Sequence, residues 1–441
     1  MIIKIDLFYG DKSLPLELPD DRVKHLLEAK PLPVPESEEK LVKAALAQPI
    51  DSAPLSELVN NGERACIIIS DMTRSWVRHH VIIPPLLDEL NKGGIADNNI
   101  MIISATGDHR EQTEKEHKLL VGEEAYRRVE VVDHRARNKE EMIFLGTTSY
   151  GTPVSINKRV ADADRVILTG GIVYHFLAGW GGGKKAIIPG VSSYETIMKN
   201  HSLAFCSEKG RGLNPDVCAG KIDDNPCSDD MVQGASLVAP VFMVNSIINE
   251  DTHQIAYVVA GNYITAFRKG CDLVSEHFGV NLPDRSELVI ASCGGYPKDI
   301  NFYQTYKTIY NAHFALEKGG TLLLVSESRE GIGSDDFFSV FTDYANNDQR
   351  EAALRQEYTI GGQMGYHSAV VAEENDVLVL SGLSDDQVEQ MGMIPIKTLE
   401  EAMAFIKKKH GSIPPAYLMP NGGSTMPCSG GSPFFRNNST I

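Results

Sequence analysis

The feature that most constrains how this chain can fold is a series of short, almost wholly apolar runs. Segments with helical spacing separate these runs. Strands that are covered on both faces have this composition, as in Arg64–Ser70 (RACIIIS) and Asn99–Thr106 (NIMIISAT). The series continues at Val129–Val132, Arg165–Thr169, Gln254–Ala260, Glu287–Ser292, Thr321–Ser326 and Asp376–Ser381. Helical spacing marks Pro84–Lys92, Ser192–His201, Thr305–Lys318 and Thr398–Lys409. The alternation predicts an α/β chain with mostly parallel sheets.

A proline among turn residues at Asn281–Arg285 (NLPDR) precedes a new apolar run and marks the predicted domain boundary. The chain has 441 residues, which is more than one hydrophobic core usually serves. We therefore predict an N-terminal α/β domain over residues 1–282 and a C-terminal α/β domain over residues 283–441. The first residues alternate apolar and polar side chains, which predicts a β-hairpin. From Asn421 the chain is rich in Gly, Ser and Asn, which favours a surface tail.

The composition excludes several classes of protein. A formal net charge of −17 repels nucleic acid, so we expect no such partner. No apolar run approaches the ~20 residues that a membrane span needs, and the N-terminus lacks the pattern of a secretion signal. We therefore expect no membrane partner and a cytoplasmic location. The 7 cysteines form no CxxC pair and match no common zinc or disulfide framework, so all are expected to be reduced.

Unusual polar residues directly follow four of the predicted strands. Ligands of open α/β sheets bind beyond the carboxyl ends of the strands, so these positions are candidates for a site. The four sets are Asp71, Thr73 and Arg74; Gly107, Asp108, His109 and Arg110; Gly170, Gly171 and His175; and Tyr303, Gln304 and Lys307. Because the pattern recurs four times, it favours a shared functional site.

The residues after the first two strands also have structural interpretations. Asp71 can cap the helix that follows it, the commoner role of Asp at such a place. Arg74 can pair with Asp71, three residues earlier, or its guanidinium can grip a carboxylate. His109 can be a plain turn residue, although its place beside Arg110 at a strand end favours a functional role. These alternatives stay open at the level of sequence.

The other histidines are equally ambiguous one by one. His175 stands in an apolar setting, where a histidine is more often a satisfied core residue than a catalytic group. His201, in MKNHS, has the position of a histidine at a helix end, where its charge suits the helix dipole. His79 and His80 are adjacent, so their side chains point in different directions, and we predict both to lie on the surface.

The segment Gly170–Gly190 (GGIVYHFLAGWGGGKKAIIPG) combines a histidine, crowded glycines and two lysines. Glycines of this density let a backbone approach a ligand closely. The run Gly181, Gly182, Gly183, Lys184 and Lys185 resembles a phosphate-binding loop only in part, because Ala186 stands where Ser or Thr would bind magnesium. The GxGxxG dinucleotide fingerprint is absent after the first strands. The run therefore favours a glycine cradle for some phosphorylated group over an ordinary nucleotide triphosphatase or NAD enzyme.

Taken in order, the motifs SDMTR, GDHR, GGIVYHFLAGWGGGKKAIIPG, the NH of MKNHS, and YQTYK resemble the nickel-pincer-nucleotide lactate racemase family. They extend from Ser70 to Lys307, so the resemblance covers most of the chain. It implies two α/β domains with mostly parallel sheets and an active-site cleft between them. It also implies a racemase or epimerase that inverts the C2 centre of a 2-hydroxy acid, lactate or a relative of it, by reversible hydride transfer. The implied cofactors are nickel and a pyridinium bis-thiocarboxylate mononucleotide, which together form the nickel-pincer nucleotide.

The resemblance assigns roles residue by residue. His109 and His175 match the two histidines that alternate as acid and base, and His201 matches the histidine that completes the nickel coordination. Lys185 matches the lysine that can hold the cofactor covalently through a thioamide. The other cofactor-binding candidates are Asp71, Lys184, Gly181, Gly182 and Gly183, and the substrate-binding candidates are Arg74, Tyr303, Gln304 and Lys307.

The chemistry of the implied reaction explains these residue types. Removing a proton beside a carboxylate puts two negative charges close together, whereas removing a hydride leaves a stable 2-keto acid. The hydride route needs a base for the hydroxyl proton, which suits histidine, and a hydride acceptor, which a cofactor supplies. Asp108 can disfavour a second acid on the substrate or orient His109, and the sequence does not decide between them. The implied partners are a small anionic 2-hydroxy acid and the proteins that synthesise the cofactor.

Two other functions stay open. The first is a nucleotide-dependent oxidoreductase or hydrolase on the same scaffold, which would depend on an added nucleotide and bind no nickel. The second is a non-catalytic binding protein for an anionic metabolite. Paired histidines argue against the second, because binding a carboxylate needs no acid/base pair.

Overall fold

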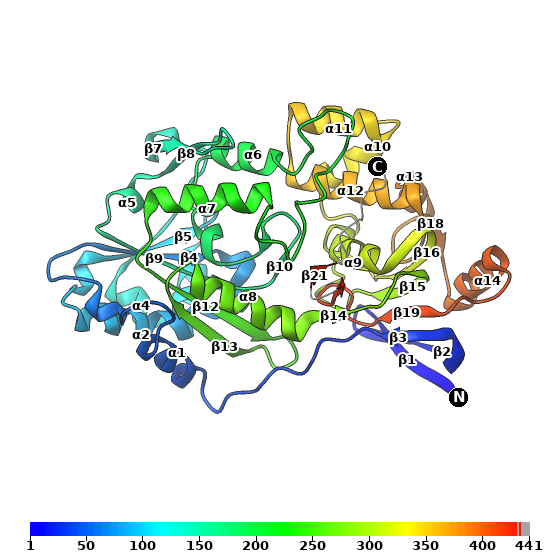
Figure 1. Cartoon of the computed structure of the whole chain (residues 1–441), viewed down its shortest axis with the longest axis horizontal. Coiled ribbons are helices and arrows are strands. Elements are labelled where there is room, and N and C mark those ends of the chain that lie inside the picture. Colours follow the sequence, from blue (N-terminus) through cyan, green and yellow to red (C-terminus); the bar gives the residue numbers. More distant parts are fainter. Residues whose placement is uncertain (430–431, 434–441) are drawn as a thin grey trace. The chain divides into compact units, whose positions relative to one another are not determined.

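The computed structural model describes residues 1–429 and 432–433. Contacts divide the chain into two compact units (Figure 1): unit 1 is Met1–Lys30, Phe205–Pro215 and His277–Ile441, and unit 2 is Pro31–Ala204 and Asp216–Glu276. This division differs from the predicted one at residue 282, because the N-terminal residues join the C-terminal part. The reason is strand pairing, since β3 (Val23–Leu26) lies parallel to β19 (Ala416–Met419) in one sheet. Within the described residues, no helix is both long enough and apolar enough to cross a bilayer.

Unit 2 is built on a six-stranded sheet with the strand order β13-β12-β9-β4-β5-β6. Its strands are β4 (Ala65–Ser70), β5 (Ile100–Ala105), β6 (Glu130–Asp133), β9 (Arg165–Gly171), β12 (Phe242–Asn249) and β13 (Gln254–Gly261). Neighbours are parallel except that β13 runs antiparallel to β12. Five of the predicted apolar runs are thus confirmed as strands of one mostly parallel sheet, and β12 joins them from outside the predicted runs.

Helices cover the sheet of unit 2. They are α1 (Glu38–Ala47), α2 (His79–Lys92), α3 (Glu114–Val121), α4 (Glu123–Arg128), α5 (Lys158–Ala161), α6 (Tyr194–Ser202), α7 (Pro226–Val238) and α8 (Thr265–Phe278). One hydrophobic core joins α1 and α2 to the sheet through buried side chains such as Val42, Leu86, Ile67 and Val244. The predicted helix at Pro84 is confirmed, but it begins earlier, at His79.

Short elements complete unit 2. They are the hairpin of β7 (Met142–Thr147) and β8 (Pro153–Asn157), the two-residue strands β10 (Tyr174–His175) and β11 (Gly179–Trp180), and the 3₁₀ helices η2 (Leu55–Glu57), η3 (Met72–Val77), η4 (Asp97–Asn99), η5 (Lys139–Glu141) and η6 (Gly183–Ala186). Of these, η3 and η6 carry two of the sequence motifs singled out above.

Unit 1 has a wholly parallel six-stranded sheet of order β18-β17-β16-β15-β19-β3. Its further strands are β15 (Ser286–Ser292), β16 (Leu316–Val325), β17 (Asp376–Leu380) and β18 (Ile394–Ile396). The helices are η1 (Asp20–Arg22), α9 (Phe302–Ala315), α10 (Asp335–Thr342), α11 (Asn347–Gln356), α12 (Ile360–Glu374), α13 (Asp385–Gln390) and α14 (Leu399–His410). Parallel sheets in both units confirm the predicted fold class.

The two ends of the chain lie in unit 1. The predicted N-terminal hairpin is confirmed as β1 (Ile2–Tyr9) paired with β2 (Lys12–Pro19), and Leu7 and Leu18 bury its inner face in the core of this unit. The predicted tail from Asn421 is partly built into the fold, because β20 (Met426–Ser429) pairs with β14 (Gly279–Asn281) and with β21 (Ser432–Pro433). Residues 430–431 and 434–441 of that tail lie outside the described residues.

Candidate functional site

Three of the sequence motifs meet at one edge of the unit 2 sheet. Strand β4 lies between β9 and β5, so the residues that follow these three parallel strands are neighbours. The chain continues from β4 to β5 on one side, whereas β9 lies on the other side, and ligands of open α/β sheets bind at such a reversal of strand order. Gly107 N–H donates to the Gly190 carbonyl at 3.0 Å, which ties the loop after β5 to the end of the glycine-rich segment.

Asp71, the first residue after β4, is the centre of a buried hydrogen-bond cluster. It is only 2% exposed, and its Oδ1 accepts from the Thr73 hydroxyl at 2.6 Å and faces the Arg74 guanidinium at 3.5 Å. Its Oδ2 lies 2.5 Å from Nδ1 of His109. Burial would raise the pKa of Asp71, but the hydrogen bonds from His109 and Thr73 and the nearby positive charges outweigh burial and lower it. Asp71 therefore acts as a carboxylate that links the first two motifs, and its side chain caps no helix.

His109 is held by this carboxylate at one nitrogen only. A carboxylate can only accept, so Nδ1 of His109 carries the hydrogen and Nε2 has the lone pair in the neutral ring. The side chain remains 47% exposed, which leaves Nε2 open to a ligand. This is the geometry of an oriented general base.

His175 and Lys185 are in direct contact. Nζ of Lys185 lies 2.7 Å from Nε2 of His175, while Nδ1 of His175 accepts the backbone N–H of Leu177 at 3.1 Å and of Ala178 at 3.3 Å. Because Nδ1 is an acceptor, the hydrogen of the neutral imidazole sits on Nε2 and points at the amine. The amine of Lys185 is then the acceptor, which requires it to be unprotonated.

The electrostatics of this pair agree with that assignment. Burial, with the positive charge of Arg74 as a smaller cause, lowers the pKa of His175 well below its usual value. Burial, followed by the charges of Arg74 and Lys184, lowers the pKa of Lys185 well below 10.5. Arg74 thus lies close enough to act on both groups, although it also faces Asp71. Both side chains keep partial exposure, so a ligand can reach them.

His201 lies in the last turn of α6 and is buried, at 2% exposed. Burial lowers its pKa to about 3, against the opposing effect of a backbone hydrogen bond at Ile197. The ring is therefore neutral, which is the form that binds a metal. The preceding residue, Asn200, is fixed by donating to Asp230 Oδ2 at 2.8 Å and to the Cys227 carbonyl at 3.1 Å.

The glycines of the GGGKK run serve close packing within unit 2. A Cβ on Gly182 would lie 2.8 Å from Asn245 Oδ1 and 3.0 Å from the Gly171 carbonyl, and one on Gly183 would lie 2.6 Å from the Phe267 ring. Gly181 is less crowded, with Val173 at 3.3 Å. The glycines therefore let this segment press against β9 and β12, which sets where Lys185 emerges.

Lys184 turns away from Lys185 into the protein. It is 3% exposed, with Nζ 3.3 Å from the Ala178 carbonyl and 4.7 Å from the centre of the Phe267 ring. Burial lowers its pKa to about 8. In this position its side chain contacts protein groups, so a role at a cofactor phosphate needs a different orientation.

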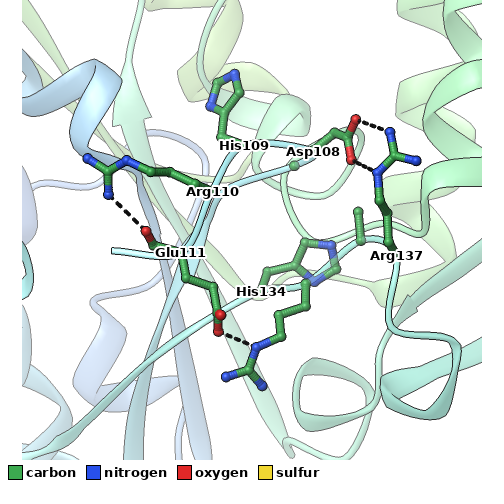
Figure 2. A pocket seen from close by; sticks show the side chains of 9 residues that line it. Asp108, His109, Arg110, Glu111, His134 and Arg137 are labelled. Carbon is green, nitrogen blue, oxygen red and sulfur yellow. Dashed lines mark hydrogen bonds and ion pairs between the residues drawn. The ribbon is translucent and has the colours of Figure 1, made fainter. Parts of the chain in front are cut away.

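The loop carrying His109 also borders a hollow of about 260 Å³, lined by residues 107–111 and 134–137. Figure 2 shows Asp108 pointing at Arg137 and the ring of His109 turned to another side. The two carboxylate oxygens of Asp108 accept from Arg137 at 2.7 and 2.8 Å, and the guanidinium stacks 3.8 Å from the centre of the Tyr194 ring. Asp108 therefore holds Arg137 and leaves the orientation of His109 to Asp71.

The fourth set of candidates belongs to unit 1. Tyr303, Gln304 and Lys307 lie in the first turns of α9, which follows β15, and the Asn301 side chain caps this helix by accepting from the Gln304 N–H at 2.9 Å. Gln304 and Lys307 are three positions apart and so share one face of the helix. Lys307 is exposed and Tyr303 packs edge-on against Phe337.

Two further residues support the site and escaped the sequence analysis. His79, predicted to lie on the surface, is 1% exposed, and its Nε2 accepts the Ser70 N–H at 2.9 Å at the end of β4. Burial and the neighbouring His80 lower its pKa to about 3, which keeps this acceptor neutral. Asn245, buried on β12, accepts the Gly183 N–H at 2.9 Å. No spacing in the sequence signals either contact, because the first depends on how α2 packs against the end of β4 and the second on how β12 packs beside the glycine-rich segment.

Within residues 1–429 and 432–433, no three His, Cys, Asp or Glu side chains gather as a metal-binding group. All 7 cysteines are free thiols, as predicted.

Comparison with known proteins identifies the relatives. Family models described as the lactate racemase N-terminal domain and the lactate racemase C-terminal domain match residues 9–212 and 282–426. Lactate racemase from Thermoanaerobacterium thermosaccharolyticum is 32% identical over 431 residues, covering 96% of this chain and 98% of the relative. Lactate racemase from Lactiplantibacillus plantarum is 32% identical over 433 residues, covering 96% and 99%.

The solved structures agree with the sequence comparisons. The lactate racemase apoprotein from Thermoanaerobacterium thermosaccharolyticum superposes with a TM-score of 0.87 at 32% identity, covering 96% of this chain and 100% of that one. A Thermotoga maritima protein has a TM-score of 0.63 at 19% identity over 89% of this chain and 99% of that one, which supports the fold alone. On these matches, which span nearly the whole chain, the protein is an isomerase that belongs to the lactate racemase family.

Proposed function

We propose that this chain racemises a 2-hydroxy acid of the lactate class by reversible hydride transfer, with a nickel-pincer nucleotide as its cofactor. The observation that carries the proposal is the contact of the Lys185 amine with His175, 2.7 Å apart. An unprotonated lysine in contact with a candidate acid/base group serves no evident structural purpose. It is what covalent attachment of a cofactor requires, since only a neutral amine is nucleophilic.

The residues present fit the proposed cofactor. Lys185 would hold it covalently through a thioamide, and His201, neutral and buried, would supply the protein ligand to nickel. The absence of a protein-only metal cluster among the described residues agrees with a metal that takes its other ligands from the pincer. When bound, the cofactor would supply the acceptor for the hydride.

His109 is the proposed base for the hydroxyl proton of one enantiomer. Its Nε2 has the free lone pair, and Asp71 stabilises the imidazolium that forms when the proton arrives. His175 is the proposed partner for the opposite face, with its hydrogen on Nε2. Both rings are neutral and differ in tautomer, because Nε2 has the lone pair in His109 and carries the hydrogen in His175.

The substrate carboxylate would be held by cationic and polar side chains. Arg74 is the proposed anchor in unit 2, since its charge acts on His175 and Lys185. Gln304 and Lys307 of α9, with Tyr303 beside them, are proposed to complete carboxylate binding through charge-assisted hydrogen bonds. Substitution of Lys307 by Met should then raise KM more than it lowers kcat.

The decisive experiment uses protein purified from a host that synthesises the cofactor. We expect nickel in the protein, an added mass located on Lys185 by peptide mass spectrometry, and interconversion of D- and L-lactate. Lys185→Ala should abolish the added mass, and His201→Ala should lower the nickel content. Full racemisation by either variant, or activity that depends on added NAD with no nickel bound, would overturn the proposal.

A further inference from the structure

Helix α7 packs against both segments that carry the candidate cofactor ligands of unit 2. It lies beside α6 (Figure 1), which carries His201 in its last turn, and it contacts η6, which contains Lys185. A Cβ on Gly234 of α7 would lie only 2.3 Å from the Ile188 side chain, so α7 presses closely on the segment that follows η6. The contact between α6 and α7 therefore sets where His201 lies relative to Lys185.

One amide and one carboxylate join the two helices. Asn200, on α6, and Asp230, on α7, are both 0% exposed. The Nδ2 group of Asn200 donates to Asp230 Oδ2 at 2.8 Å and to the Cys227 carbonyl at 3.1 Å. In the other direction, the Cys227 thiol donates to the Asn200 carbonyl, with 3.5 Å between sulfur and oxygen. We call Asn200 and Asp230 the helix lock.

The hairpin of β7 and β8 holds the same two helices in place. Oδ1 of Asp230 accepts from the hydroxyl of Thr148, the residue that follows β7. One helical turn before Asn200, the Thr196 hydroxyl donates to the Pro153 carbonyl of β8 at 2.6 Å. Both oxygens of Asp230 are thus engaged, and the buried polar face of α6 is bound at two successive turns.

A buried amide and carboxylate are an unfavourable way to pack two helices, because both groups lose hydration. A pair of apolar side chains of similar shape in their place can be neutral or even stabilising. Hydrogen bonds differ from apolar contacts in being directional. The helix lock therefore fixes how α6 is rotated about its own axis, which apolar packing would leave less defined.

Rotation of α6 moves the residue that follows the lock. Side chains reach about 5–6 Å from the axis of an α-helix, so a rotation of about 10° shifts a side-chain tip by about 1 Å. A metal–ligand bond tolerates a deviation of only about 0.2 Å. His201 is the next residue after Asn200 and is buried, so even a small rotation of α6 would move its imidazole out of bonding distance.

We propose that Asn200 and Asp230 are positioning residues for His201: the helix lock fixes the rotation of α6, so that the imidazole stays where it can bind nickel. This inference rests on the proposed function for the role of His201. It adds Asp230, which no motif of the sequence marks, and all of its residues belong to unit 2. Its readout is retention of the metal, which does not depend on catalytic rate.

Replacement by leucine removes the hydrogen bonds of the lock and keeps side chains of similar size. The test variants are Asn200→Leu, Asp230→Leu and the double variant with both changes. The double variant separates stability from positioning, because it leaves neither partner of the lock buried without the other. The control is Lys199→Leu, which places a leucine at an exposed position of the same helix.

The experiment uses cofactor-loaded protein and compares wild type with the four variants. We expect the three lock variants to lose nickel to a chelator about tenfold faster or more, the usual effect of removing a residue that orients a metal ligand. The mass added to Lys185 should remain in all of them, since the lock does not act on that attachment. Lys199→Leu should match wild type, and thermal denaturation shows which variants are folded at the assay temperature.

The other outcomes overturn one proposal or both. A folded double variant that keeps its nickel as wild type does would show that the lock serves packing alone. A double variant that does not fold, or one without the mass on Lys185, would show that the lock supports the whole fold or the whole site, and the assignment to His201 would be wrong. A wild-type protein without nickel would instead overturn the proposed function, and the inference with it.

Discussion

The ends of β5 and β9 each carry one candidate acid/base histidine, and the two rings are held in opposite ways. His109 gives its Nδ1 hydrogen to the Asp71 carboxylate, so its Nε2 has a lone pair. His175 uses Nδ1 to accept two backbone N–H groups, so its Nε2 carries the hydrogen. One residue type is thus prepared as a base at one strand end and as a hydrogen donor at the other.

The surroundings of His175 also affect whether its ring can carry a positive charge. Burial, with the charge of Arg74 as a smaller cause, lowers the pKa of His175, and the two N–H donors at Nδ1 also disfavour its imidazolium. The neutral partner of His175 is the Lys185 amine, so attachment of a cofactor to that amine would also change the environment of the histidine.

Removing either ring is expected to have the largest effect. His109→Asn and His175→Asn should each lower the racemisation rate by about 10⁴-fold from both enantiomers, since acid/base groups contribute up to this factor. Only His175→Asn should also reduce the mass added to Lys185, because it removes the ring that contacts and places the amine. Initial rates from D- and L-lactate and the intact mass of each variant test this. A variant that kept a tenth of wild-type activity would exclude that histidine as an acid/base group.

Replacing the carboxylate that orients His109 is expected to have the second-largest effect on the rate. Asp71→Asn should lower the rate by about 10³-fold, because an amide neither stabilises the imidazolium nor fixes the same ring hydrogen. The variant should bind nickel and carry the Lys185 adduct as wild type does, since the side chain of Asp71 is engaged with His109, Thr73 and Arg74. Steady-state rates and metal analysis on the same preparation check both statements. A joint loss of rate and cofactor would mean that Asp71 binds the cofactor instead.

A third prediction concerns the lysine buried beside the His175 segment. The pKa of Lys184 is lowered to about 8 from 10.5, so the unfolded chain holds more protons than the folded one between these values. The free energy of unfolding therefore rises with pH across this window. The contribution of Lys184 to it is fully present above pH 10.5 and is lost as the pH falls toward 8. The rise attributable to Lys184 is at most about 3 kcal/mol.

Lys184→Met should remove this contribution, because methionine keeps most of the packing against Phe267 and carries no charge. Urea unfolding of the apoprotein at pH values near 8 and near 10 measures the effect in wild type and variant. The stability of the two proteins should converge as the pH rises. Equal pH dependence in both would show that Lys184 keeps its proton in the folded state.

Much of this site follows from the sequence, since strand ends in a parallel sheet must lie at one edge. The apolar runs before Asp71, His109 and Gly170 predict that edge, and the structure has β9, β4 and β5 side by side there. The motif order also leads to the family, which nearly full-length matches confirm. What could be predicted is therefore what depends on local pattern and on residues close in the chain.

The parts that could not be predicted depend on contacts between distant segments. Residues 1–30 join unit 1 because β3 pairs with β19, nearly four hundred positions later in the chain. His79 is buried because its ring accepts a backbone N–H of β4, which adjacency to His80 does not reveal. The partner of Asp108 is likewise a guanidinium on a separate loop, so its role stayed undecided until Arg137 was placed.

Removing the carboxylate that binds Arg137 is expected to have the smallest effect on the rate, and it is the matched control for Asp71→Asn. Asp108 is adjacent to His109 in the chain, but its carboxylate binds Arg137, and the ring of His109 is held by Asp71. Asp108→Asn should therefore change lactate racemisation by less than about threefold, since a half-exposed ion pair contributes about 1 kcal/mol or less. Asp71→Asn and Asp108→Asn make the same chemical change on either side of one histidine. The racemisation rates of the two variants should be measured together. A large loss of rate in Asp71→Asn and a small one in Asp108→Asn would assign the orientation of His109 to Asp71. Equal losses would show that charge near the ring matters more than the hydrogen bond to Nδ1.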